Sequence, residues 1–195
     1  MKKQEIDEEQ GINEKQEINE EQEINEEQEI NEEQEIKKKI ENSEEIENDK
    51  FMRLALIEAR KAANIDEVPV GAVIVKNGEV IGRGYNRRET DKDPLGHAEI
   101  TAISEAAKTL GGWRLLGCKL YVTLEPCPMC TGAIIQARIE KIVYGTKDPK
   151  SGACDSKVKL ISDFSWNHKV EVISGVLENE CSRILKEYFR GKRIS

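Results

Sequence analysis

The feature that most limits the fold is the alternation of short apolar runs with amphipathic segments along most of the chain. Residues 51–62 place apolar side chains at roughly helical spacing, and the apolar runs 70–75 and 80–85 flank Asn77-Gly78, a pair typical of tight hairpin turns. Further expected helices are 97–110, 127–138 and 177–189, and further expected strands are 119–124, 141–145 and 170–173. The order α-β-β-α-β-α-β-β-α predicts an α/β domain whose mostly buried sheet is covered by helices.

The N-terminal segment follows a different pattern. The unit Asn-Glu-Glu-Gln-Glu-Ile recurs, and isoleucine stands at six-residue intervals from Ile6 to Ile36. Successive isoleucines would lie about 240° apart on an α-helix, so they form three stripes rather than one coiled-coil seam. We therefore expect residues 1–48 to be an acidic low-complexity tail, disordered or transiently helical, with an interaction tail as the alternative. Asp49 is expected to cap the first helix of a single domain, residues 49–195.

The formal charge divides the chain at the same point. Residues 1–48 hold 19 acidic and 6 basic side chains, a net −13, whereas residues 49–195 hold 19 acidic and 24 basic ones, a net +5. The basic domain fits a polyanionic partner, because lysine and arginine contacts to phosphate dominate nucleic-acid affinity, although solubility alone also explains such a charge. A tail of net −13 would repel RNA if it lay near an RNA site.

The cysteines and the hydropathy pattern bear on the compartment. No apolar run approaches the roughly 20 residues needed to span a membrane, and no hydrophobic segment follows the N-terminal lysines as in a secretory signal. An odd number of cysteines with one close pair is not typical of a disulfide framework. The five are Cys118, Cys127, Cys130, Cys154 and Cys181. We expect a cytoplasmic protein without membrane association, in which some of these thiols bind metal.

The close pair, Cys127 and Cys130, falls at the start of an expected helix. A helix N-terminus favours thiolates, and two thiolates with the imidazole of His97 would make a three-ligand zinc site that leaves a fourth position for water. A redox pair or half of a structural zinc knuckle are the alternatives for Cys-x-x-Cys alone. The sequence has no second Cys-x-x-Cys, and its other histidine is His168.

Glu99 follows His97 by two residues, so the two side chains project about 200° apart on a regular helix and need not both bind the metal. A carboxylate near metal-bound water can accept its proton and return it to a leaving amine. A favourable contact with the helix dipole is the alternative role for this glutamate.

The motif His-x-Glu followed by Pro-Cys-x-x-Cys is a signature of zinc-dependent nucleobase deaminases. The chain resembles this superfamily, and more narrowly the bacterial-type tRNA adenosine deaminases, over about residues 50–193. The stretches that carry the resemblance are VPVGAV at 68–73, GYN at 84–86, HAEI at 97–100, TLEPCPMCTGA at 123–133, YGTKDPKSGA at 144–153, NHKV at 167–170 and residues 180–190.

The resemblance implies a three-layer α/β/α, cytidine-deaminase-like fold with a mixed sheet of about five strands. It assigns one zinc ion per subunit to His97, Cys127 and Cys130, and the proton shuttle to Glu99. The implied reaction is hydrolysis of adenosine to inosine at the wobble position of a tRNA anticodon, in which zinc-activated water attacks C6 and ammonia leaves. Family members are homodimers that bind the anticodon stem-loop, so the same partners are implied here.

The resemblance also implies a base pocket and an RNA-binding surface. Candidate substrate-binding residues are Asn86, Val70, Ala98, Pro126 and Asp148; a turn is the alternative role of Asn86 and Asp148, and core packing is that of Val70 and Pro126. Candidate phosphate contacts are Lys147, Lys150, Arg190 and Arg193, each of which could instead be a solvated surface cation. The sequence departs from the family at Leu95-Gly96, where members often carry Thr-Ala before the zinc histidine.

Two other functions remain open from the sequence. A free-base or nucleoside deaminase of the guanine or cytidine type would share the zinc chemistry, but the basic domain and the loop 147–153 favour RNA. A non-catalytic zinc-binding module would use the same three ligands, but it would not need Glu99.

Overall fold

The computed structural model describes residues 34–163 and 165–194, and the chain divides into two compact units, Met1–Ile46 and Glu47–Ser195. In the first unit the described residues, 34–46, are helical and include an ion pair between Glu35 and Lys39. The isoleucine repeat up to residue 33 lies outside the described residues, so the expected conformation of the tail stays a prediction. No described helix has a stretch long and apolar enough to cross a membrane.

A five-stranded mixed sheet forms the centre of the second unit, with strand order β2-β1-β3-β4-β5. The strands are β1 (Gly71–Lys76), β2 (Glu79–Tyr85), β3 (Cys118–Leu124), β4 (Lys141–Thr146) and β5 (Glu171–Ser174). Strand β1 pairs antiparallel with β2 and β3, whereas β3 with β4 and β4 with β5 pair in parallel. The predicted α/β fold with a mixed sheet is therefore confirmed.

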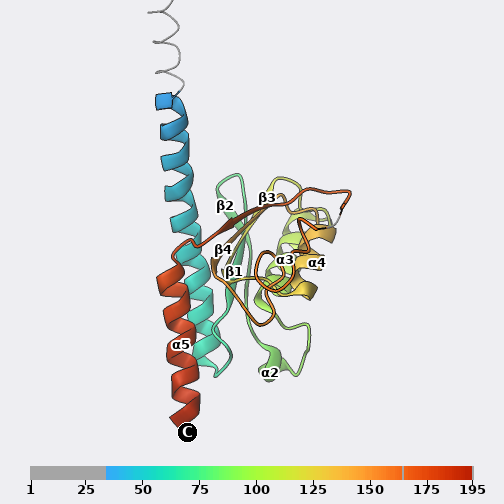
Figure 1. Cartoon of the computed structure of the whole chain (residues 1–195). Coiled ribbons are helices and arrows are strands. Elements are labelled where there is room, and N and C mark those ends of the chain that lie inside the picture. The colour runs from blue at the N-terminus through green and yellow to red at the C-terminus, as the bar shows by residue number, and fades with distance from the viewer. Residues whose placement is uncertain (1–33, 164, 195) are drawn as a thin grey trace, which may run out of the picture. The chain divides into compact units, whose positions relative to one another are not determined.

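Helices cover both faces of this sheet (Figure 1). Besides the helical residues 47–64, they are α2 (Arg88–Asp91), α3 (Ala98–Leu110), α4 (Pro128–Gln136) and α5 (Glu178–Ile194). Residues 47–64 and α5 lie on one face, and α3 and α4 lie on the other. Alternate residues of β1 accordingly enter two different cores: Ile74 packs with α3 and α4, whereas Val75 packs with residues 51–56. Residues 71–75 of β1 are buried on both faces of the strand, which explains why none of them is polar.

The capping propensity of Asp49 predicted that the first helix begins there, but the helix begins earlier. Residues 47 and 48 are already helical. Asn48 is 5% exposed and its Oδ1 accepts a hydrogen bond from the hydroxyl of Tyr121 on β3, while Glu47 pairs with Lys119 at 2.5 Å. Contacts with the sheet thus hold this part of the helix in place and override the local start signal at Asp49.

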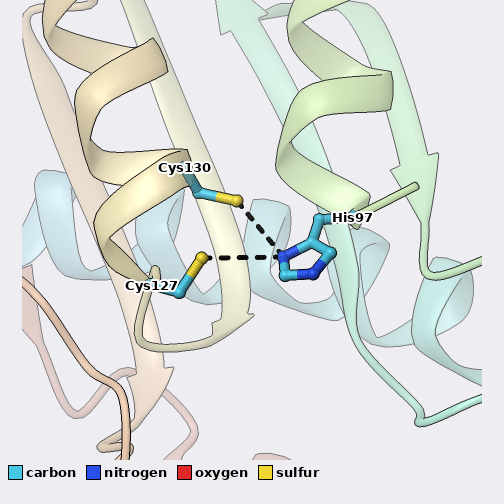
Figure 2. A group of neighbouring side chains, drawn as sticks. All are labelled: His97, Cys127 and Cys130. Carbon is cyan, nitrogen blue, oxygen red and sulfur yellow. Dashed lines mark hydrogen bonds between the residues drawn. The ribbon is translucent and has the colours of Figure 1, made fainter. Parts of the chain in front are cut away.

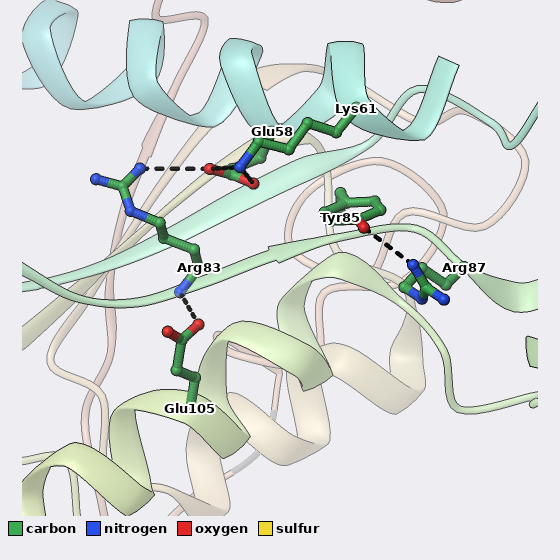
Figure 3. A network of polar contacts seen from close by, with 6 residues as sticks. All are labelled: Glu58, Lys61, Arg83, Tyr85, Arg87 and Glu105. Atoms are coloured by element: carbon green, nitrogen blue, oxygen red, sulfur yellow. Dashed lines mark hydrogen bonds and ion pairs between the residues drawn. The ribbon is translucent and has the colours of Figure 1, made fainter. Parts of the chain in front are cut away.

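Strand β2 forms an edge of the sheet, and a polar network secures it (Figure 3). The backbone N–H of Arg83 donates to Glu105 of α3 at 2.8 Å, and the guanidinium of Arg83 contacts the buried Glu58 at 3.4 Å. Glu58 is also paired with Lys61 at 2.7 Å. An edge N–H that is bonded to a side chain is not free to pair with another chain, so this network protects the edge.

Candidate metal centre and substrate pocket

The candidate site lies where helices α3 and α4 begin. Figure 2 shows the side chains of His97, Cys127 and Cys130 pointing toward one another. The Nδ1 atom of His97 lies 3.7 Å from Sγ of Cys127 and 3.5 Å from Sγ of Cys130. All three potential ligand atoms lie within 4.8 Å of one another, so the structure brings together the three residues that the sequence singled out.

The helix termini explain why these side chains are available. His97 and Cys127 occupy the N-cap positions of α3 and α4 with extended backbones, and neither side chain makes a capping hydrogen bond. An N-cap side chain usually satisfies the first N–H groups of its helix, so these two are left free for another partner. Pro128 opens α4, where its missing N–H costs nothing, and Cys130 follows within the first turn.

The imidazole nitrogen lies from each sulfur at the spacing expected for a tetrahedral zinc site. Zinc ligand distances of about 2.3 Å to sulfur and about 2.0–2.1 Å to nitrogen place the two ligand atoms about 3.5–3.6 Å apart at a tetrahedral angle. The observed separations of 3.7 Å and 3.5 Å match this value. The group can therefore hold a metal ion, and two sulfurs with one imidazole are a donor set that zinc prefers.

The two cysteine thiols of the cluster differ in pKa. Hydrogen bonds from Cys130 and His97 lower the pKa of the Cys127 thiol to about 4, although partial burial opposes this. The pKa of Cys130 is raised, because this thiol donates to Cys127 and is buried. A metal ion bound here would displace the thiol protons, because the thiolate is the form of cysteine that binds metal.

Glu99 lies in the first turn of α3 and is only 4% exposed. Burial raises the pKa of its carboxyl. It lines the same pocket as His97 and Cys127, so a titratable group stands beside the three-ligand cluster. His168 takes no part in the cluster, because its Nε2 atom lies 2.7 Å from the carbonyl oxygen of Ile139.

A pocket opens beside the cluster. Its lining consists of Val68, Val70, Asn86, Arg88, His97, Ala98, Glu99, Leu124, Glu125, Cys127, Asp148 and Ser151. Four of the five expected substrate-binding residues are in this lining. The fifth, Pro126, is buried outside it, and its carbonyl accepts hydrogen bonds from the Ala153 N–H and the Thr131 hydroxyl. Leu95, at the departure from the family pattern, is 53% exposed and also lies outside the lining.

Asn86 is held from two directions in the pocket wall. Its backbone N–H donates to the carbonyl of Val70 at 3.0 Å, and its Nδ2 donates to Oε2 of Glu67 at 3.0 Å. Glu67 is 1% exposed, and its Oε1 accepts the backbone N–H of Thr90 in α2 at 2.6 Å. No local pattern in the sequence points to Glu67, because its partners lie 19 and 23 residues away.

A second buried carboxylate, Glu125, organises the loop that carries Asp148. Its Oε1 accepts the backbone N–H groups of Cys154, Asp155 and Ser156 at 3.1, 2.8 and 2.9 Å. Its Oε2 accepts the N–H of Asp148 at 3.0 Å and the hydroxyl of Ser156. Burial opposes ionisation, but these hydrogen bonds hold the pKa of Glu125 below its usual value. An ionised carboxylate thus fixes the loop from inside.

Asp148 forms a turn, the alternative role that the sequence left open, and it also lies at the pocket. Its Oδ1 accepts the backbone N–H of Lys150 at 2.9 Å, and its Oδ2 accepts the hydroxyl of Ser151 at 2.7 Å, as in a turn. Asp148 and Ser151 also line the pocket. The turn therefore holds two polar side chains at the pocket wall.

Gly152→Ala is expected to disturb this loop. A Cβ at position 152 would lie 2.3 Å from Cδ of Glu125 and 2.7 Å from the carbonyl oxygen of Asp148. Because Glu125 is fixed by its hydrogen bonds, we expect a loss of about 1–3 kcal/mol in the free energy of unfolding, the range for overpacking. Denaturant unfolding measures it. Gly112→Ala is the control, since a Cβ there meets nothing within 4 Å. Equal stability of both variants would show that the loop does not need Gly152.

A separate hollow lies between the end of β4 and helix α5. It is lined by Thr146, Lys147, Lys150, Ser182, Leu185, Lys186, Phe189, Arg190, Lys192 and Arg193. The four cations expected to contact phosphate are all in this lining, joined by Lys186 and Lys192. The structure therefore gathers cations from two distant segments at one surface, which the sequence alone showed only as separate residues.

Comparisons with known proteins agree with this site. The family model described as MafB19-like deaminase matches residues 46–193. The chain is 51% identical over 143 residues to a tRNA-specific adenosine deaminase of Bacillus subtilis (strain 168), covering 73% of this chain and 89% of the relative. It is 50% identical over 144 residues to a tRNA-specific adenosine deaminase of Agrobacterium fabrum, covering 74% and 95%.

A solved structure from a study of A-to-I editing by tRNA:A34 deaminases at the wobble position of transfer RNA is also similar. Its TM-score is 0.67 at 50% identity, with 69% of this chain and 98% of that chain covered. The family match includes the three clustered residues, Glu99 and helix α5, and it leaves out residues 1–45.

Proposed function

Because this chain belongs to the family of tRNA-specific adenosine deaminases, we propose that it hydrolyses adenosine to inosine at the wobble position of a tRNA anticodon. The observation that carries the proposal is the convergence of two thiols and one imidazole beside the buried Glu99 in a single pocket. A bare scaffold site would not need this carboxyl group.

His97, Cys127 and Cys130 would hold one zinc ion per subunit. When bound, zinc supplies a water nucleophile of lowered pKa, which is available at neutral pH. The three side chains set its position, because they extend from the N-termini of two helices that pack on the same face of the sheet.

Glu99 would move the proton. It accepts a proton from the attacking water and delivers it to the amine that leaves C6 of adenine, so that adenosine and water give inosine and ammonia. Its burial keeps bulk water from competing for this proton.

The pocket wall would hold the extruded base. A base must leave the stack before its C6 can be reached, and Val70, Ala98 and Asn86 offer apolar and polar surface to receive it. Asp148 would contact the RNA near the target nucleotide. Lys147, Lys150, Arg190 and Arg193 would bind phosphates of the anticodon stem-loop.

The remaining expectations are part of the same proposal. We expect the protein to act as a homodimer in the cytoplasm, where reduced thiols are available to bind metal. All five cysteines are free thiols in the structure, in keeping with such an environment. For residues 1–45, which precede the segment matched by the family model, we propose an acidic tail outside the deaminase domain.

The substrate class can be tested with purified, zinc-loaded protein and a tRNA transcript that carries adenosine at the wobble position. We expect inosine at that position, measured by mass spectrometry of the digested RNA, and no conversion of free adenosine, cytidine or guanine. The same transcript with guanosine at the wobble position is the control for editing elsewhere.

Other outcomes of this assay would identify the alternatives. If only a free base or nucleoside is converted, the metal site and Glu99 keep their proposed roles, but RNA is not the substrate. If zinc is bound and no substrate is converted, the protein is a zinc-binding module rather than this deaminase.

A further inference from the structure

Glu67 is a buried carboxylate that the proposed chemistry does not use. It is 1% exposed and precedes β1, next to the pocket residue Val68. Both of its oxygens face N–H donors, namely Nδ2 of Asn86 at 3.0 Å and the backbone N–H of Thr90 at 2.6 Å. An ionised carboxylate offers acceptors only, so it satisfies both donors at once.

This pairing determines how the Asn86 amide is turned. If the amide rotated by half a turn, its Oδ1 would face Oε2 of Glu67, and two acceptors cannot form a hydrogen bond. The backbone of Asn86 is also fixed, because its N–H donates to Val70 at 3.0 Å. The amide therefore has one orientation, and Asn86 presents a fixed arrangement of donor and acceptor at the pocket wall.

We propose that Glu67 is a positioning residue for base recognition: it locks the Asn86 amide in the orientation that adenine requires. The proposal rests on the deaminase function given above. In adenine the ring nitrogens are acceptors, and the amine is the group that leaves. A fixed amide can therefore discriminate between bases through ring atoms that take no part in the reaction.

Glu67→Gln tests the proposal, because glutamine has nearly the same shape but offers one acceptor and one donor. The backbone N–H of Thr90 cannot turn, so the glutamine oxygen stays with Thr90 and its NH₂ group faces Asn86. The Asn86 amide must then turn over to accept. We expect kcat/KM for a wobble-adenosine stem-loop to fall about 10–100-fold, the effect of one misplaced buried hydrogen bond.

Glu58→Gln is the matched control. Glu58 is equally buried at 2% exposure, but it binds Lys61 and Arg83 beside strand β2 rather than a pocket residue (Figure 3). We expect this variant to lose stability and to keep wild-type kcat/KM. If Glu67→Gln has the same kcat/KM as Glu58→Gln, the positioning role is wrong.

Base analogues separate positioning from general damage. Stem-loops with 3-deazaadenosine or 7-deazaadenosine at the wobble position each lack one ring acceptor remote from C6. We expect one of the two analogues to lower kcat/KM for the wild type and for Glu58→Gln. The same analogue should not lower kcat/KM of Glu67→Gln below its value with adenosine. An unchanged analogue pattern in Glu67→Gln would contradict the proposal.

Thermal unfolding tests the pairing without any substrate. Asn86→Asp alone places two carboxylates together and is expected to lower Tm strongly, whereas Glu67→Gln with Asn86→Asp restores a donor–acceptor pair and should recover much of the loss. Glu58→Gln with Asn86→Asp should recover nothing. If the double variant does not recover Tm, the pairing of Glu67 with Asn86 is refuted. If Tm is recovered but the wild-type protein is inactive on tRNA, only the proposed function is refuted.

Discussion

Glu99→Gln is expected to leave the fold and the zinc content unchanged and to lower turnover of wobble adenosine by about 10²–10⁴-fold, the usual contribution of a general acid–base group. Glutamine has the volume of glutamate but cannot take up a proton and pass it to the leaving amine. Because Glu99 is only 4% exposed, bulk water cannot readily replace it. Single-turnover inosine formation, metal analysis and a melting curve measure the three quantities.

Glu105→Gln provides the matched control for this substitution. Glu105 is an exposed glutamate of the same helix α3, and its carboxylate accepts only the backbone N–H of Arg83 among the described hydrogen bonds. We expect near wild-type turnover from this variant. If Glu99→Gln turns over as fast as the wild type, Glu99 takes no part in the mechanism. If Glu99→Gln loses zinc as well as activity, the role of Glu99 is structural.

Cys130→Ala should remove zinc from the protein and abolish deamination. The substitution leaves one thiol and one imidazole, and we expect the zinc content to fall from about one ion per chain to less than about a tenth of that. A ligand that binds the folded state raises its stability, so a chelator should lower the Tm of the wild type and have little effect on the variant. Metal analysis and calorimetry with and without chelator provide the measurements.

Cys118→Ala is the control for the loss of a buried thiol. Cys118 is fully buried at the start of β3 and lies outside both the ligand cluster and the pocket lining. Burial raises the pKa of its thiol, which disfavours the metal-binding thiolate form. This variant should keep its zinc and its response to the chelator. Full zinc content in Cys130→Ala would show that the metal is held elsewhere.

Local sequence determined most of the secondary structure, and a sequence motif identified the ligand residues. The order of strands and helices in the domain follows from hydrophobic periodicity, because periodicity reports which side of each element is buried. His97, Cys127 and Cys130 could be identified because they match the motif His-x-Glu followed by Pro-Cys-x-x-Cys, although the two segments lie 30 residues apart. The prediction failed at Asp49, where contacts of Asn48 and Glu47 with β3 extend the helix past its expected start.

Only the tertiary structure showed how the pocket is supported. The pairing of Glu67 with Asn86, and of Glu125 with the loop 148–156, joins segments that no periodicity links. The sheet order β2-β1-β3-β4-β5 places these segments side by side, and it depends on the packing of the whole domain. A buried polar group takes its partner from whichever element packs against it, so the sequence determined the reacting groups and the tertiary structure decided what holds them in place.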